Sequence, residues 1–256
     1  MLQTGWCRRR IGATLVLISL LAPGVVIGAT ATPALAKEVP FSVVSPSLPV
    51  VSSLADLRGA IDVRIRELDQ LSRAVAASST LTKSNSGALN TLLSNEIAGL
   101  STLELSAESD TTASELAADA RTMVLTYRVY SIVLPVVQTV IRADVSHAAA
   151  ARIAALIPSI KTTIVASTAP SVRLARAKSL LATLPRLVTS IDATLAGVTA
   201  KVLALNPQNA RPSSPTLNAA VSASKRAKNE VNVAYATVGR IIVLVAGANA
   251  PSSRRR

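Results

Sequence analysis

Apolar residues recur in steps of three and four along most of the chain, the spacing of one buried face of an α-helix. The first such stripe consists of Leu54, Leu57, Ile61, Ile65, Leu68, Leu71 and Val75. Ser53 precedes the stripe and Asp56 follows three residues later, a pair that is typical of a helix start. The pattern therefore predicts a first helix that begins near Ser53.

Residues 78–87 are rich in Ser, Thr, Asn and Gly and predict a turn or a frayed helix start, and two further stripes follow them. They are Leu89, Leu93, Ile97, Leu100 and Leu103, and then Leu116, Met123, Tyr127, Tyr130 and Leu134. Thr112 and Glu115 form a capping box in front of the second stripe. Pro135 removes a backbone donor and crowds the carbonyl of Ser131, so we expect a kink there and more helix beyond it.

The second half of the chain carries three longer stripes. They are Val145, Ala149, Ile153, Leu156, Ile160 and Ile164; Leu181, Leu184, Val188, Ile191, Leu195, Val198, Val202 and Leu205; and Leu217, Val221, Val231, Tyr235, Val238, Ile242 and Val245. Pro158 predicts a kink in the first, Pro185 a bend or split in the second, and Pro215 a capped start for the third. No run alternates as a strand does, so the sequence predicts an all-α fold over residues 53–248. We expect five or six long antiparallel helices, as an elongated bundle or coiled-coil-like hairpins.

The first 36 residues resemble a secretory signal peptide in composition. Three arginines at residues 8–10 precede an apolar run at residues 11–27, and Ala34 and Ala36 satisfy the small-x-small rule of signal peptidase. The alternative is a retained membrane anchor, which is disfavoured because Pro and Gly interrupt the run before a cleavage site. We therefore expect cleavage after Ala36 and a secreted, extracellular protein that can associate with the cell wall.

Cleavage would leave residues 37–256, with a Pro/Ser-rich extended linker at residues 37–52 and a disordered basic tail at residues 249–256. It would also remove the only Cys and the only Trp, so neither disulfides nor Cys-bound metal are expected to stabilise the fold.

Within residues 37–256, the two most apolar stretches follow Arg128 and Arg240, and each contains 13 uncharged residues. A membrane span needs about 20, so no span is expected after cleavage.

The charge of the chain is strongly positive and unevenly distributed. Its formal net charge is +13, and it falls to +10 without the three leader arginines. Residues 51–150 contain 8 basic and 11 acidic side chains, whereas residues 151–256 contain 15 basic and 2 acidic ones. Such a surface favours polyanionic partners, which outside a cell are anionic wall polymers or lipid head groups. Nucleic acid is disfavoured because export separates the protein from it and aromatic stacking residues are few.

The basic residues that we predict to bind a polyanion lie in three groups along the chain. They are Arg173, Arg176 and Lys178; Lys225, Arg226 and Lys228; and Arg254, Arg255 and Arg256. Such side chains attract polyanions through screened charge with little specificity. The alternative interpretation is a solvated basic face without a specific ligand.

Few residues have the spacing of a metal or catalytic site. His147 is the only histidine and shares a helical face with Asp144, but a zinc site needs three or four ligands. An acidic group, which lacks the spacing of a calcium loop, is interpreted as a solvated face. Its members are Glu104, Glu108, Asp110, Glu115 and Asp119. We therefore predict no metal and no cofactor. Without a nucleophile motif, a non-enzymatic protein is expected, although a glycosidase with distant carboxylates is formally compatible.

Tyr127, Arg128 and Tyr130 form the most distinctive segment, Tyr-Arg-Val-Tyr-Ser-Ile-Val-Leu-Pro at residues 127–135. The two tyrosines fall on the apolar stripe, which favours packing, and Arg128 could pair with acids of a neighbouring helix or form part of a ligand site. With Glu-Ile-Ala-Gly-Leu at residues 96–100 and the Pro-containing loop before the last helix, the segment resembles a group of uncharacterised secreted helical proteins of high-GC Gram-positive bacteria. The resemblance covers Leu81 to Val245, although this chain is richer in alanine and more basic at its end. It implies an extracellular helical bundle and carries over no activity.

Three functions follow from these patterns, in order of preference. The first is an exported, non-enzymatic scaffold or interaction protein of the cell envelope, bound to anionic polymers through its basic C-terminal half. The second is a secreted protein that docks another protein, or a second copy, through an apolar helical seam, as adhesins and effectors do. The third is an envelope hydrolase.

Overall fold

The computed structural model describes residues 52–208, 211 and 214–246. Within them every regular element is a helix and there is no strand, so the predicted all-α class is confirmed for this part of the chain. The predicted signal peptide with Ala34 and Ala36, the linker up to residue 51 and the tail from residue 249 lie outside the described residues. The described helices all belong to one compact unit.

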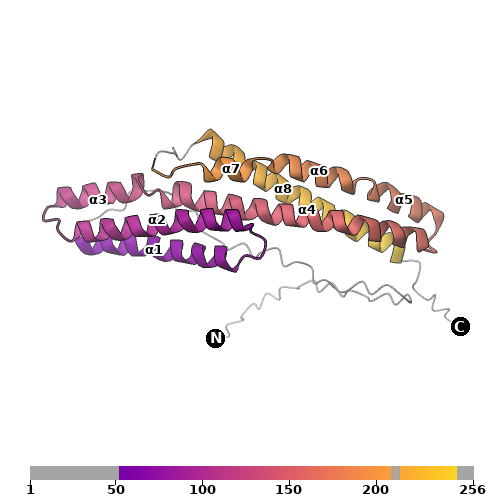
Figure 1. Ribbon diagram of the computed structural model, residues 1–256, viewed down its shortest axis with the longest axis horizontal. Coiled ribbons are helices and arrows are strands. Elements are labelled where there is room, and N and C mark those ends of the chain that lie inside the picture. Colours follow the sequence, from indigo (N-terminus) through magenta and orange to yellow (C-terminus); the bar gives the residue numbers. More distant parts are fainter. Residues whose placement is uncertain (1–51, 209–210, 212–213, 247–256) are drawn as a thin grey trace, which may run out of the picture. The chain divides into compact units, whose positions relative to one another are not determined.

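Helices α1 (Leu54–Ala77) and α2 (Lys83–Ala107) lie side by side (Figure 1). The hydroxyl of Ser53 accepts the Asp56 N–H at 3.2 Å, as the sequence predicts. Helix α2 begins inside the predicted turn, because the Thr82 hydroxyl caps its first turn. The Ser, Asn and Gly residues that suggested a loop therefore form the first turns of α2.

The helical run around Pro135 is interrupted earlier than predicted. Helix α3 (Ala113–Leu125) ends before Arg128, whose φ of 47° places it in the left-handed region. A single π-helical turn, η1 (Val129–Val133), then leads directly into α4 (Leu134–Ala166). Pro135 therefore lies in the first turn of α4, where a proline is tolerated because few of the N–H groups there have helical partners.

The stripe from Leu181 to Leu205, which predicts one helix with a bend or split at Pro185, is divided among three helices. These are α5 (Ser171–Leu181), α6 (Leu184–Leu195) and α7 (Val198–Leu203). The first division falls just before Pro185, as expected, and the second at Gly197, where φ is 69°. A β-carbon is strained at such a φ, so glycine is the residue suited to this break. Helix α8 (Pro215–Ala246) begins at the predicted proline, and α4 continues through Pro158.

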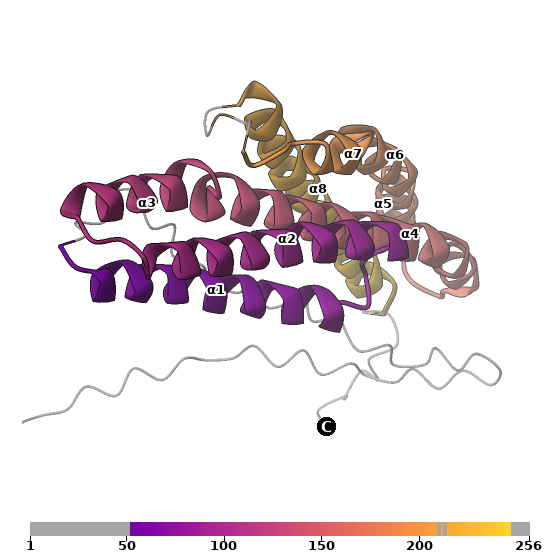
Figure 2. The ribbon, with the colours of Figure 1, turned by 60° about the vertical axis from the view of Figure 1, so that its left-hand side comes forward.

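Buried apolar side chains form four clusters that share α4 as the common element. One cluster joins α1, α2, α3 and η1 to the first turns of α4. The other three lie among η1, α4 and the helices α5 to α8. Figure 2 shows α1 and α2 side by side below α3 and the first part of α4, with α3 leading into α4, while α5 to α8 pack along α4. The chain thus builds its acidic half and its basic half onto one long helix.

Two helical stretches, Ala113–Ala166 and Pro215–Ala246, are long and apolar enough to cross a membrane by length and composition. A core helix of a soluble protein passes the same test, and 44% of the most apolar window of the first stretch is buried. Only 28% of the corresponding window in α8 is buried. The apolar window of α8 is therefore less buried than that of the first stretch.

Candidate functional site

Helix α5 packs on the C-terminal half of α8, and both helices present basic side chains to solvent. Their inner sides share one cluster, which includes Ala177 and Ile241. Arg173, Arg176 and Lys178, predicted from the sequence, are all exposed on α5. Arg240 of α8 is exposed as well. The packing of α5 on α8 therefore brings cations from two distant segments onto one surface.

A groove of about 520 Å³ lies between these two helices. It is lined by Arg176, Leu180, Gly239, Arg240, Val243 and Leu244, together with Ala236. Leu180 and Leu244 are half-buried and pack against the apolar cluster, so they form its deeper part. The two arginines and Val243 are exposed. None of the described residues that line this groove is a carboxylate, and the groove therefore combines an apolar interior with positive charge at its edge.

The outward side of α8 continues this surface toward its N-terminus. Its exposed residues at helical spacing are Lys225, Arg226, Asn229, Val233, Ala236, Arg240 and Val243, which include no acid. Lys225 and Arg226 thus share a face with Arg240, but 14 to 15 residues separate them, roughly 20 Å along a helix. Lys228 is half-buried and lies off this face. The predicted group at Lys225 is therefore spatially separate from the α5 group.

Sequence reasoning missed Arg240 and the exposed valines beside it. The periodic seam placed Ile242 in the core, but Ile241 is the buried residue and Ile242 is 54% exposed, so that assignment was wrong. Adjacent isoleucines fit either register, and the position of α5 decides which one is covered. The predicted residues Arg254, Arg255 and Arg256 lie outside the described residues.

The aromatic segment forms a second polar region, between α1, α2 and η1. Tyr130 donates to the Glu67 carboxylate, and the Arg64 guanidinium lies 5.0 Å from the centre of the Tyr130 ring. Arg64 is buried and also donates to the Ala60 carbonyl at 2.8 Å. Burial raises the pKa of Tyr130 to about 12, and the bond to Glu67 adds to this effect. The predicted packing role of Tyr130 thus includes a polar contact with two charged residues of α1.

Tyr127 packs on the neighbouring helix α2, where Gly99 leaves room for its ring. Glu96, one turn earlier on α2, is only 5% exposed, and its Oε2 has no hydrogen-bond partner. Burial raises the pKa of the Glu96 carboxyl to about 7. Burial also raises the pKa of Tyr127, with smaller effects from Glu96 and Asp119. Sequence reasoning missed Glu96, because a glutamate beside an apolar stripe resembles an ordinary solvated residue.

Arg128 forms no ion pair with an acid of a neighbouring helix among the residues that the structure describes. Its Nε donates to the Leu125 carbonyl at 2.5 Å, while its buried Nη1 has no partner. The side chain therefore closes the end of α3, whose last carbonyls lack helical partners.

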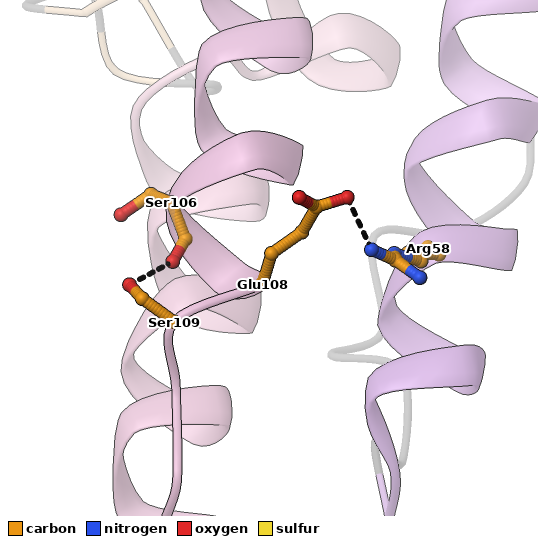
Figure 3. A network of polar contacts seen from close by, with 4 residues as sticks. All are labelled: Arg58, Ser106, Glu108 and Ser109. Carbon is orange, nitrogen blue, oxygen red and sulfur yellow. Dashed lines mark hydrogen bonds and ion pairs between the residues drawn. The ribbon is translucent and has the colours of Figure 1, made fainter.

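The acidic group between α2 and α3 serves mainly local structure. Glu108 pairs with Arg58 of α1, and the Ser109 hydroxyl donates to the Ser106 carbonyl at 2.7 Å (Figure 3). Glu115 completes the predicted capping box. Asp119 is half-buried, and its pKa is raised by burial and by the nearby Asp110. The acidic group is therefore only partly a solvated face, because Glu108 and Glu115 have local structural partners and Asp119 is half-buried.

Asp144 and His147 do not act together. Asp144 accepts hydrogen bonds from Thr82 and Asn85 at the start of α2, whereas the His147 ring lies 3.1 Å from Asp192. Among the described residues, no group of three or more His, Cys, Asp or Glu side chains could hold a metal ion.

Comparison with protein-family models, with curated proteins and with solved structures finds no match to this chain. The resemblance to secreted helical proteins thus remains a prediction. The geometry of the α5 and α8 surface is the best available guide to function.

Proposed function

We propose that the chain is an exported, non-enzymatic interaction protein of the cell envelope. In this proposal its helices form an elongated antiparallel bundle of hairpins, and its basic C-terminal half binds an anionic partner. The observation that carries the proposal is the pairing of Arg176 with Arg240 along one groove without a carboxylate.

The charge distribution supports this proposal. In the described part of the second half, Asp192 faces His147 and Glu230 is half-buried, and neither lines the groove. Cations without nearby acids keep their full attraction for an external anion, whereas paired cations do not. Several such cations on one surface bind a polyanion more tightly than each would alone.

Co-sedimentation of residues 37–256 with purified cell walls, across a salt series, tests this proposal. Binding should be strong at low salt, fall as salt screens the charges, and disappear after the anionic polymers are stripped from the walls. Replacing Arg176 and Arg240 together by Gln should weaken binding, while replacing Arg66 and Arg73 of α1, which are also exposed, should not. A protein that stays in solution at low salt would contradict the proposal.

Docking of another protein is the second candidate, and exposed apolar residues favour it. Leu105 at the end of α2 and Leu125 at the end of α3 are 66% and 56% exposed. Burying such side chains in a partner is favourable and depends little on salt. Salt-resistant binding that is lost on replacing both leucines by Ser would support this candidate.

A further inference from the structure

The groove between α5 and α8 combines exposed arginines with exposed apolar side chains. Val243, which lines it beside Arg176, is 70% exposed. Val172 lies one turn before Arg176 on the same face of α5 and is 79% exposed. Covering such valines by an apolar phase is favourable, because water is released from their surface.

The combination of exposed cations and exposed apolar side chains extends along α8. Val233 is 54% exposed and lies seven residues before Arg240, about two helical turns, on the same face. We call the six residues Val172, Arg176, Val233, Gly239, Arg240 and Val243 the α5–α8 surface. They include two cations, three valines and no acid. Ile242, near Arg240 on α8, is also 54% exposed.

We propose that the α5–α8 surface is a contact site for a bilayer that contains anionic phospholipids. Arg176 and Arg240 contact lipid phosphates, while the valines enter the boundary between head groups and acyl chains. This inference rests on the proposed function and adds a lipid bilayer to the anionic partners of the basic half.

The chemistry of the surface distinguishes a bilayer from other anionic partners. A soluble polymer would neutralise the two arginines but leave the three valines in water. A bilayer offers anionic groups and hydrocarbon within one contact layer, and both contributions add in peripheral membrane binding. The groove between the arginines has half-buried Leu180 and Leu244 in its deeper part, so it presents an apolar surface beside the two cations.

Gly239 allows a test that preserves the fold. A β-carbon at Gly239 would meet nothing within 4 Å, so Gly239→Glu places a carboxylate beside Arg176 and Arg240 without a clash. Gly59 on α1 is exposed and equally open, so Gly59→Glu makes the same change of residue and charge far from the α5–α8 surface. Both replacements substitute a better helix former for glycine.

The experiment is flotation of residues 37–256 with vesicles of phosphatidylcholine, alone or mixed with phosphatidylglycerol. A chain that begins at residue 37 retains all four apolar clusters, which lie between residues 54 and 245. We expect binding to the mixed vesicles only, and a loss on the order of tenfold in Gly239→Glu but not in Gly59→Glu. Val243→Ser should also weaken binding, unlike Val63→Ser on α1.

Three results would overturn the inference. Equal binding by Gly239→Glu and Gly59→Glu would place the membrane contact elsewhere. Binding to walls without binding to vesicles would refute the bilayer contact while leaving the proposed function intact. Absence of binding to walls, to stripped walls and to vesicles would refute both.

Discussion

The ring of Tyr127 lies directly against Gly99, so that a β-carbon at position 99 would be 2.3 Å from its Cε1 atom and 3.1 Å from its hydroxyl. This contact joins α2 to the segment just before the left-handed Arg128. A glycine on α2 thus helps to fix where α3 ends.

Gly99→Ala should therefore destabilise the protein, although alanine is the better helix former. Forcing a methyl group against the ring costs about 1–3 kcal/mol, which exceeds the gain in helix propensity. Denaturant unfolding followed by circular dichroism measures the change. Gly87→Ala, on the same helix with open space around it, should be neutral or stabilising. In a Tyr127→Ala background, the penalty at position 99 should largely vanish; an unchanged penalty would show that the ring is not its cause.

The break at Arg128 shows where sequence reasoning stopped. The capping positions Ser53 and Thr112 were predicted correctly because each acts within its own first turn. The left-handed residue was missed, since the local pattern favours continuous helix and the contact with Gly99 lies about 28 residues away in sequence. Gly197 was missed for a related reason, because the apolar spacing continues across it.

The candidate site was likewise predictable only where a local pattern in the sequence indicates it. An excess of cations in the second half could be counted in the sequence, and Arg176 was found in this way. Which cations meet depends on how α5 packs on α8, and no local pattern reports that pairing. Arg240 and the groove were therefore visible only in three dimensions.

Glu96 predicts a pH dependence of stability. Burial raises the pKa of its carboxyl from 4.5 to about 7 in the folded state, so between these values the folded chain holds a proton that the unfolded chain releases. Its contribution to stability is fully present below pH 4.5 and is lost as pH rises to about 7, a total of up to about 3 kcal/mol.

Glu96→Gln should remove that dependence and make the protein more stable than the parent at pH 8. Urea unfolding at pH 5 and at pH 8 measures both effects. Glu104→Gln, two turns further along α2 and half-buried, is the control and should leave the pH dependence unchanged. If Glu96→Gln has the same pH profile as the parent, the buried carboxyl does not titrate in this range.

The tyrosines predict a second pH effect, at alkaline pH. Burial raises the pKa values of Tyr127, Tyr130 and Tyr235, the three tyrosines of the chain, and that of Tyr130 reaches about 12. The folded protein should therefore show little phenolate absorbance near pH 10, whereas the urea-unfolded chain should titrate there. Because the folded state holds these protons more tightly, stability should fall as pH rises above 10. A full phenolate signal at pH 10 in the folded protein would contradict this prediction.

Asp144 predicts a coupling between α4 and the start of α2. Its carboxylate accepts the Thr82 N–H at 3.0 Å and the Asn85 side-chain amide at 2.9 Å, and it is 5% exposed. Asp144→Ala would leave both donors without this acceptor in a half-buried position, so the protein should lose about 2–3 kcal/mol of stability. Asp192→Ala, which removes an exposed carboxylate near His147, should cost much less because exposed ion pairs contribute little. Hydrogen exchange locates the effect: faster exchange in the first turns of α2 in Asp144→Ala supports the cap, whereas an even increase over all helices would show that the carboxylate acts on the fold as a whole.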